Sequence, residues 1–371
     1  MKRRPWIWVA GFLLLTVIAL GSAALLTART DPFFHYHKPY TEDYYYPLDN
    51  ERSQNDGIVK HFDYTGLITG TSMAENFSAS EAEFLWGGTF VKVPSSGGSY
   101  KELNDMLRTA LKHNPELKVI IRGLDMDMFM DDKDRMRTDL GVYPTYLYDE
   151  NPFNDVHYLF NRDVFFSRVY PMLNNRYDIG IDLFDEYANW MEWFRFGKNT
   201  LYPDGITAPE AGEPVHLTEE EAERVRANVR QNVTALAEEY PGVTYYCFIT
   251  PYSAGWWMKQ VENGTACRVN EAERIVIEEI LKCPSIRLYS FNTRFDITTD
   301  LNHYKDLTHY GEWINSLILQ SMCEGKGLLT AENYNSYLEE ELAFYTSYDY
   351  TQMNAQDDYE DDYEAVGTAE M

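Results

Sequence analysis

The chain has 371 residues, enough for one large α/β unit with attached segments. Its 59 acidic and 32 basic residues give a formal net charge of −27, which argues against nucleic-acid binding because that needs clustered lysine and arginine. The four cysteines have no C-x-x-C spacing, so a structural zinc site is not expected, and no metal or cofactor is predicted. Disulfide pairs and free thiols both stay open for Cys247, Cys267, Cys283 and Cys323.

Residues 6–26 form an uncharged apolar run preceded by Lys2, Arg3 and Arg4. As a helix this run covers about 30 Å, the thickness of a hydrocarbon core, so it predicts a membrane span within a segment 1–30. The basic start and the later Asp31 predict a cytoplasmic N-terminus and a body outside the cytoplasm. A cleaved signal peptide is the alternative, but the run is longer than a usual signal core. We therefore expect a single-pass protein of the cell membrane, held in the lipid bilayer through residues 6–26.

Residues 31–64 are rich in Tyr, His, Pro and Asp and show little apolar periodicity. They predict an irregular juxtamembrane collar. His35 and His37 form an H-x-H pair in it, which we interpret as ordinary surface histidines because no further ligands lie nearby.

From Thr65 onward, short apolar runs alternate with amphipathic stretches, the pattern of βα units on a parallel sheet. Strands are predicted at 66–70, near 84–86 and 90–93, at 117–122, at 243–249 and at 286–291. Helices are predicted at 100–113, from a capping box of Thr218 and Glu221, at 270–281 and at 311–322. The expected fold is α/β and flavodoxin-like: a three-layer sandwich with a five-stranded, mainly parallel sheet, in a domain spanning 65–330.

Residues 126–213 interrupt this rhythm, because they are dense in Tyr, Phe and Trp and contain several prolines. We predict that they form an insert after the third strand, near the carboxyl ends of the strands, where ligands bind to such sheets. Residues 331–371 are expected to contain a C-terminal helix followed by a disordered acidic tail.

The run Gly70-Thr71-Ser72-Met73-Ala74-Glu75-Asn76 follows the first predicted strand. A serine at a strand-to-helix junction exposes its hydroxyl beside helical N–H groups that can stabilise an oxyanion, so Ser72 is a candidate nucleophile. Helix capping is the alternative reason for a serine at such a position.

A second candidate motif, Asp306-Leu307-Thr308-His309, precedes the last predicted helix. A serine hydroxyl needs a base to take its proton, and a carboxylate three residues before a histidine can orient that imidazole. Asp306 and His309 are therefore the candidate acid and base. Asp300 and His303 have the same spacing, and spacing alone does not choose between the two pairs.

Together these residues resemble the SGNH or GDSL-type hydrolases and their membrane-bound acyltransferase relatives. Gly70-Thr71-Ser72 matches the serine block, Gly97-Gly98 the glycine after the second strand, and Asp306-x-x-His309 the closing block. The resemblance spans roughly residues 60–325 and is greatest to anchored bacterial proteins of the envelope. It implies acyl-ester chemistry, as in teichoic-acid D-alanylation and alginate O-acetylation, and it favours Asp306 and His309 because the family places its pair beside the final helix.

The sequence departs from the family pattern in the third block, where Gly-x-Asn is replaced by Gly123-Leu124-Asp125. An ionised Asp125 accepts hydrogen bonds and cannot donate one to an oxyanion. The expected oxyanion donors are the backbone N–H groups of Ser72 and Gly98, with Asn76 or a protonated Asp125 as a third.

Two functions are consistent with these patterns. The first is an extracytoplasmic serine O-acyl esterase or acyltransferase that acts on cell-envelope glycans through an acyl-Ser72 intermediate, with an envelope glycan or a membrane acyl-donor protein as partner. Aromatic residues of the insert are candidates for stacking on sugar rings, with core packing as the alternative: Tyr143, Tyr146, Trp190 and Trp193. The second function is a catalytically inactive protein of the same fold that binds glycans or a membrane partner.

Overall fold

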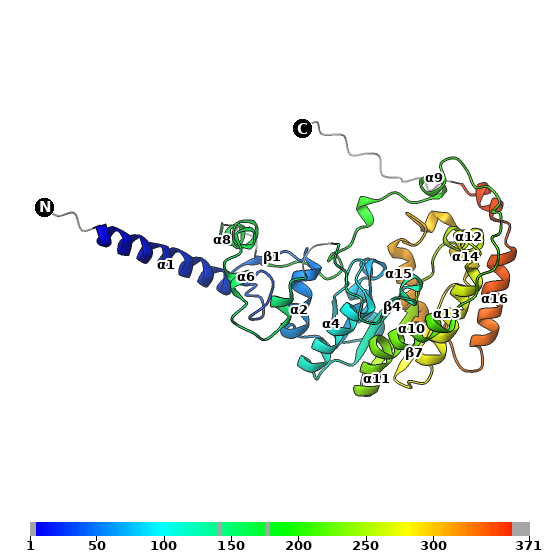
Figure 1. The fold of residues 1–371 in the computed structure, drawn as a ribbon, viewed down its shortest axis with the longest axis horizontal. Coiled ribbons are helices and arrows are strands. Elements are labelled where there is room, and N and C mark those ends of the chain that lie inside the picture. The colour runs from blue at the N-terminus through cyan, green and yellow to red at the C-terminus, as the bar shows by residue number, and fades with distance from the viewer. Residues whose placement is uncertain (1–4, 140–142, 175–178, 358–371) are drawn as a thin grey trace.

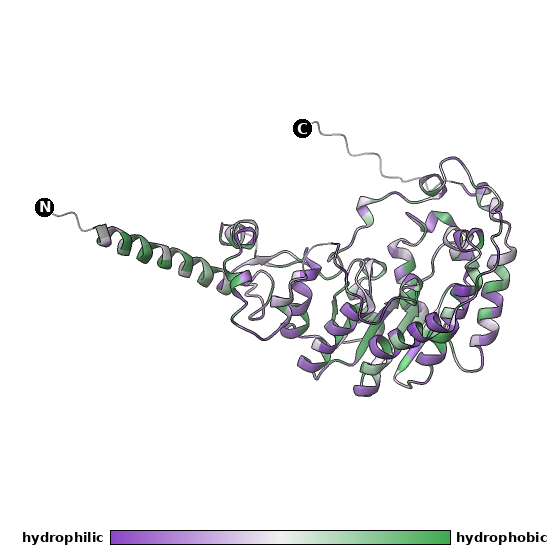
Figure 2. Ribbon diagram, viewed as in Figure 1, coloured by the Kyte–Doolittle hydropathy of each residue, from purple (hydrophilic) through white to green (hydrophobic). Residues whose placement is uncertain are grey.

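A computed structural model describes residues 5–139, 143–174 and 179–357, in which one long N-terminal helix leads into an α/β body (Figure 1). This helix, α1, runs over Pro5–Thr30, and large apolar side chains such as Trp8 and Phe12 are exposed along it. Figure 2 shows that apolar residues line α1 over most of its length. Among the described residues, α1 is the one helix long and apolar enough to be a membrane span or a signal sequence.

A five-stranded parallel sheet forms the centre of the body. Its strands are β2 (Gly66–Thr69), β3 (Phe90–Lys92), β4 (Val119–Leu124), β6 (Thr244–Ile249) and β7 (Ile286–Ser290), in the order β3-β2-β4-β6-β7. This is the flavodoxin-like order, so the predicted fold class is confirmed. The order reverses direction between β2 and β4, and that switch point is where such sheets place their ligand sites.

Helices in two groups cover the sheet. α3 (Ala79–Trp86) contacts α15 (Glu312–Cys323), whereas α4 (Tyr100–His113), α10 (Glu219–Val229), α11 (Ala235–Glu239) and α13 (Ala266–Ile280) contact one another directly or through the π-helical turn η5 (Arg230–Thr234). Right-handed crossovers place the two groups on opposite faces. α12 (Ala254–Glu262) and α16 (Tyr334–Ser347) pack against α13 and against each other. The remaining short helices of the domain are η1 (Ser72–Ala74), η2 (Met126–Met128), α14 (Phe295–Thr298), η6 (Leu301–His303) and η7 (Tyr350–Ala355).

Of the two apolar runs expected near the second strand, 90–93 contains β3, whereas 84–86 is the end of helix α3. Ser78 caps the start of this helix by accepting the N–H of Glu81, and Gly87 ends it with a φ of 74°. The three apolar residues thus belong to a helix that ends at a glycine. All four cysteines are free in the structure.

The segment 31–64 is less irregular than expected, because it contains helix α2 (Glu51–His61). The side of α2 that packs inward carries polar as well as apolar residues, and the Gln54 side chain donates to the carbonyls of Pro32 and Pro47. The sequence of α2 therefore shows no apolar residues at helical spacing, although one side of the helix is buried. Its role as a separate collar stays a prediction.

The insert divides into two parts. Its first part contains the short helices α5 (Thr145–Tyr148), α6 (Val156–Leu159), α7 (Arg162–Val164), η3 (Phe165–Val169) and α8 (Tyr170–Asn174), and α6 and η3 contact α1. Strand β5 (Gly180–Ile181) then pairs with β1 (Tyr45–Tyr46) of the collar. The later part, with η4 (Met191–Trp193) and α9 (Lys198–Leu201), returns to the domain. The acidic tail predicted near the C-terminus lies, from residue 358 on, outside the described residues.

Position 57 of α2 requires glycine, because the backbone of this helix lies very close to the backbone of Phe33 and Phe34. A Cβ atom at this position would overlap the carbonyl oxygens of Phe33 and Phe34, which cannot move without shifting the chain after α1. We expect Gly57→Ala to lower the free energy of unfolding by about 1–3 kcal/mol. The matched control is Gly242→Ala, because nothing lies within 4 Å of a Cβ there. Thermal unfolding of the full chain in detergent measures both, and equal melting temperatures would contradict the expectation.

Candidate active site

Ser72 lies in a tight turn directly after β2, at the carboxyl edge of the sheet. Thr71 caps η1, and its hydroxyl accepts the N–H of Met73 at 3.4 Å. At Gly70 a Cβ atom would lie 2.9 Å from the Cβ of Ala74, so the turn closes tightly only with glycine there. Ser72 is thus the first residue of a short helix, where backbone N–H groups have no partner within the helix.

A hydrogen-bonded chain joins Ser72 to His309 and Asp306. Ser72 Oγ lies 2.8 Å from His309 Nε2, and His309 Nδ1 lies 2.8 Å from Asp306 Oδ2. Because Nδ1 faces a carboxylate, it carries the proton of the neutral imidazole, and Nε2 is then the acceptor for the serine hydroxyl. The three side chains named from the sequence are therefore in contact, in an order that allows proton transfer from Ser72 to His309.

Asp306 is held in its ionised form. Burial acts to raise the pKa of this carboxyl, but hydrogen bonds and charge from His309, together with the N–H of Thr308, hold the pKa below its ordinary value. The backbone N–H groups of Thr308 and His309 donate to Asp306 Oδ1 at 2.9 and 2.8 Å. A carboxylate so fixed keeps the imidazole in one orientation.

The loop that carries His309 is fastened to the loop after β6. Tyr304 donates through its hydroxyl to the carbonyl of Pro251 at 2.9 Å, and Ser253 Oγ donates to the carbonyl of Leu307 at 2.7 Å. Tyr304 also forms an antiparallel bridge with Tyr310. These contacts hold the short turn that carries His309 in place.

The earlier pair of the same spacing does not contact the serine. His303 Nδ1 accepts the indole N–H of Trp313 at 2.9 Å, and its Nε2 lies 3.8 Å from Asp300. Of the two Asp-x-x-His motifs, only the later one has its histidine hydrogen-bonded to Ser72.

Asp125 has hydrogen-bond partners that differ from those expected for an oxyanion donor. It is fully buried, and its two oxygens accept the hydroxyls of Thr71 at 2.6 Å, Tyr252 at 3.0 Å and Thr250 at 3.3 Å. Burial raises its pKa, while the hydroxyls of Thr71 and Tyr252 act to lower it. The Thr71 hydroxyl donates to Asp125 and also accepts the Met73 N–H, so Asp125 acts as an acceptor that positions the serine turn. We leave Asp125 out of the oxyanion hole.

The backbone N–H of Gly98 also has a hydrogen-bond partner other than a substrate. Its backbone N–H donates to the carbonyl of Ser95 at 2.8 Å, in the turn before α4. The expectation of an oxyanion donor at Gly98 is not met. An N–H group that is already hydrogen-bonded within a tight turn cannot also face a substrate beside Ser72.

Asn76 and Trp190 lie close to the reacting pair. The backbone N–H of Trp190 donates to Asn76 Oδ1 at 3.1 Å, and its indole N–H donates to the carbonyl of Ser72 at 3.3 Å. The Trp190 ring also meets the His309 imidazole edge to face. Asn76 Nδ2 is buried and has no acceptor among the residues that the structure describes. Trp190 therefore forms a wall of the site.

Lys305 covers that wall. Its Nζ lies 3.9 Å from the centre of the Trp190 ring and 3.5 Å from that of Phe194. This cation–π clamp occupies the ring of Trp190, which makes the tryptophan less available for sugar stacking than expected. Trp193 is 81% exposed and remains accessible.

Two other aromatic candidates lie away from the serine. Tyr143 contacts the ring of Tyr148 and the guanidinium of Arg52, and Tyr146 packs against His157 in the small apolar cluster at the end of α1. The structure therefore places neither with Ser72, because this half of the insert lies beside α1.

A buried lysine, not foreseen from the sequence, supports the serine turn. Lys92 of β3 is fully buried, and its Nζ donates to the backbone carbonyls of Glu75, Phe77 and Asp185. Burial lowers the pKa of Lys92 to about 7, against the attraction of nearby carboxylates. The signal in the sequence is the lysine in the apolar run Phe90-Val-Lys-Val, since a charge inside a buried strand needs partners.

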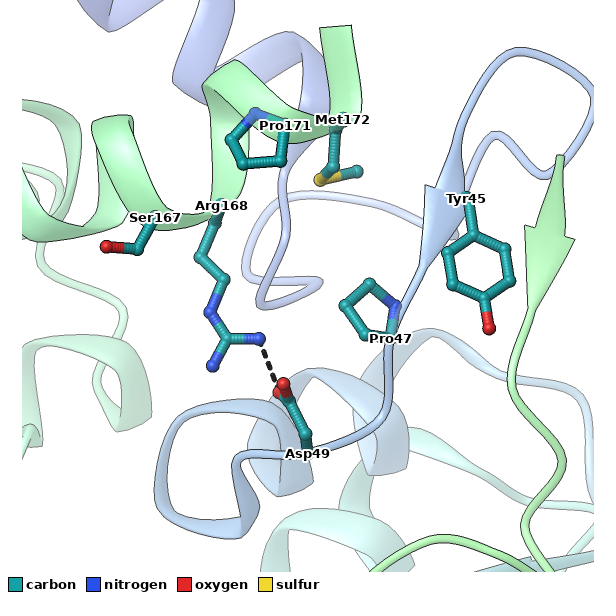
Figure 3. Close-up of a pocket in the computed structure, with 7 residues that line it drawn as sticks. All are labelled: Tyr45, Pro47, Asp49, Ser167, Arg168, Pro171 and Met172. Atoms are coloured by element: carbon teal, nitrogen blue, oxygen red, sulfur yellow. Dashed lines mark hydrogen bonds and ion pairs between the residues drawn. The ribbon is translucent and has the colours of Figure 1, made fainter. Parts of the chain in front are cut away.

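A cavity of about 350 Å³ lies outside this site, between the collar and the insert (Figure 3). It is lined by Tyr45, Pro47, Asp49, Ser167, Arg168, Pro171 and Met172, and the guanidinium of Arg168 reaches across it to pair with Asp49. Within the described ranges, no three His, Cys, Asp or Glu side chains are grouped to hold a metal ion.

Comparisons with known proteins add little to this geometry. No protein-family model matches the chain, and no curated protein matches it. A solved structure from Streptococcus pneumonia, provisionally named a platelet activating factor, is 10% identical and covers 74% of this chain and 90% of its own, with a TM-score of 0.39. A likeness of this extent supports no statement about activity, which has to be argued from the residues of the chain itself.

Buried Glu75, beside the serine turn and close to partly buried Glu51, predicts how stability changes with pH. Burial, and then the charge of Glu51, raises the pKa of Glu75 from its ordinary 4.5 to about 8. Between these values the folded protein holds a proton that the unfolded chain has lost, so the free energy of unfolding falls as pH rises through this window. We expect the melting temperature of the native chain to fall between about pH 6 and pH 8, and Glu75→Gln to flatten this fall because glutamine cannot ionise.

The control for this measurement is Glu116→Gln, which changes an exposed glutamate. It should leave the pH dependence at its native steepness. If all three proteins lose melting temperature equally over this range, Glu75 is not the group responsible.

Proposed function

We propose that this chain is a membrane-anchored serine esterase or acyltransferase of the SGNH type, working through an acyl-Ser72 intermediate. The observation that carries the proposal is the hydrogen-bonded chain Ser72–His309–Asp306, with 2.8 Å at each step. Nucleophile, base and orienting carboxylate in this geometry are what acyl transfer requires. The resemblance of the three sequence blocks to that family supports the same class of reaction.

In the first half of the reaction, Ser72 Oγ attacks the carbonyl carbon of an ester while its proton moves to His309 Nε2. The tetrahedral intermediate collapses, the ester C–O bond breaks, and the departing alkoxide takes the proton from His309. Asp306 stabilises the imidazolium that forms between these steps. The acyl group is then covalently bound to Ser72.

In the second half, His309 takes a proton from water or from an acceptor hydroxyl, which attacks the acyl carbon. The bond to Ser72 breaks, and Ser72 recovers its proton from His309. Water as acceptor gives a hydrolase, and a sugar hydroxyl gives a transferase. An anchor in the cell membrane with the body outside the cytoplasm favours envelope glycans as the acceptor, and the exposed Trp193 is available to stack on a sugar face.

The proposed oxyanion donors are the backbone N–H of Ser72 and the Nδ2 of Asn76. The N–H of Ser72 begins η1, and Asn76 Nδ2 is a donor with unused hydrogens four residues further on. A buried donor without an acceptor costs free energy, and an entering carbonyl oxygen relieves that cost. Since Nδ2 is covered, its use requires the segment around Trp190 to lift when substrate binds.

The proposal is tested by reaction with a fluorophosphonate, which phosphonylates an activated serine. The full chain in detergent should be labelled, Ser72→Ala should not be, and His309→Gln should slow labelling by about 10²–10⁴-fold because the base is lost.

The matched control is His303→Gln, the histidine of the second Asp-x-x-His motif, which should label at the native rate. Equal labelling of the native chain and Ser72→Ala would refute the nucleophile. A well-folded native chain that takes no label would favour the inactive glycan-binding or partner-binding protein.

Asn76→Asp tests the oxyanion hole. Aspartate keeps an acceptor for the Trp190 N–H but replaces the donor with a second acceptor, so we expect the rate of phosphonylation to fall by roughly 10²–10³-fold. Thermal unfolding checks that the variant is folded. A folded variant that reacts at the native rate would remove Asn76 from the mechanism.

A further inference from the structure

Exposed apolar side chains concentrate in one stretch of the insert. Outside α1, more than half of the large apolar side chains exposed in the described residues lie between positions 153 and 183: Phe153, Val156, Phe160, Phe166, Tyr170, Ile179 and Leu183. Phe153 is 87% exposed and Phe166 is 62% exposed. Soluble surfaces rarely gather apolar residues in this way without a partner.

The helical segment formed by α7, η3 and α8 has apolar residues on both sides. Val164, Val169 and Met172 are buried in the protein, while Phe166 and Tyr170, four residues apart, are exposed on the outer side. Residues at this spacing lie on one face of a helix. The inner face is already covered by the protein, so the outer aromatic face is the one that needs an explanation.

This segment lies at the end of the apolar run of α1. α6 and η3 contact α1, and Leu26, the last residue of the run, packs with Phe165 and Leu173 around one small apolar cluster. Figure 1 shows α6 and α8 beside the C-terminal end of α1. If residues 6–26 fill the hydrocarbon core, whatever packs on Leu26 lies at the boundary between lipid and water.

Buried hydrogen bonds hold this part of the insert to the end of α1. Asp31 accepts the backbone N–H groups of His35 and Tyr36 and the hydroxyl of Tyr158 of α6, at 3.0, 2.7 and 2.9 Å. Tyr36 donates through its hydroxyl to Asp155 at 3.0 Å. The position of α6 relative to the anchor is thus set by groups that are costly to separate.

We propose that the outer face of residues 153–170 lies in the headgroup region of the bilayer that α1 crosses. The protein then contacts lipid twice, through a span and through a surface segment whose exposed Phe and Tyr side chains suit the interface, where aromatic rings are enriched. The inference rests on the anchoring in the proposed function but not on the serine chemistry. A net charge of −27 makes aromatic burial, and not attraction to anionic lipid, the source of this contact.

Photo-crosslinking in lipid nanodiscs tests the contact. The full chain carries p-benzoylphenylalanine at one position at a time, in nanodiscs of phosphatidylcholine and phosphatidylglycerol, and lipid adducts are measured by mass spectrometry. We expect adducts at positions 153 and 166, and at position 14 inside α1. The matched control is position 84, because Phe84 of α3 is 87% exposed, as Phe153 is, but belongs to a helix that packs against α15.

Adducts at 14 without adducts at 153 and 166, or equal adducts at 153, 166 and 84, would overturn the surface contact. Absence of adducts at position 14 as well would overturn the anchoring and the contact with it. Fluorophosphonate labelling of the same samples reports separately on Ser72, so a failure of the lipid contact is distinguished from a failure of the proposed reaction.

Discussion

The hydrogen bond between Ser72 and His309 joins two loops that lie 237 positions apart in the chain, and the site exists only if both reach the same point. Ser72 follows β2 and His309 comes after β7, with β4 and β6 between these strands. At about 4.8 Å per strand, the histidine loop has to return roughly 14 Å across the sheet edge. The hydrogen bonds of Tyr304 to Pro251 and of Ser253 to Leu307, which join the histidine loop to the loop after β6, fix that return path. The active-site geometry therefore depends on the β6 loop, although that loop supplies none of the three reacting side chains.

Buried ionisable side chains lie next to the serine turn. Asp125 holds Thr71 from one side, and Lys92 binds the carbonyls of Glu75 and Phe77 from the other. Each charge is costly to bury alone, but each is satisfied by several hydrogen bonds, and together they leave the turn little freedom to move. As the proposed nucleophile, a serine held in this way needs little reorganisation when charge develops on a substrate.

The fold was predictable because its strands are short apolar runs and its longer helices carry capping boxes and apolar stripes, as at Ser99 of α4 and Thr218 of α10. The Ser72, Asp306 and His309 motifs were also visible, since each sits at the end of a predicted element. The partners of Asp125 were not, because Tyr252 and Thr250 come from a different loop and carry no local pattern. Helix α2 was not predicted for a similar reason. Its buried face is largely polar, and its contacts there are tertiary hydrogen bonds that leave no local pattern in the sequence.

The junction at Asp31 also has a geometric consequence for the whole molecule. Since hydrogen bonds of Asp31 tie the end of α1 to the collar and to α6, the domain is not free to swing about α1. A protein on a long tether samples a wide shell of space, whereas in the proposed membrane-anchored state Ser72 would keep to a narrow range of heights and tilts above the lipid surface. For the proposed acyl transfer, such a fixed attachment would select acceptors by their distance from the membrane as well as by their chemistry.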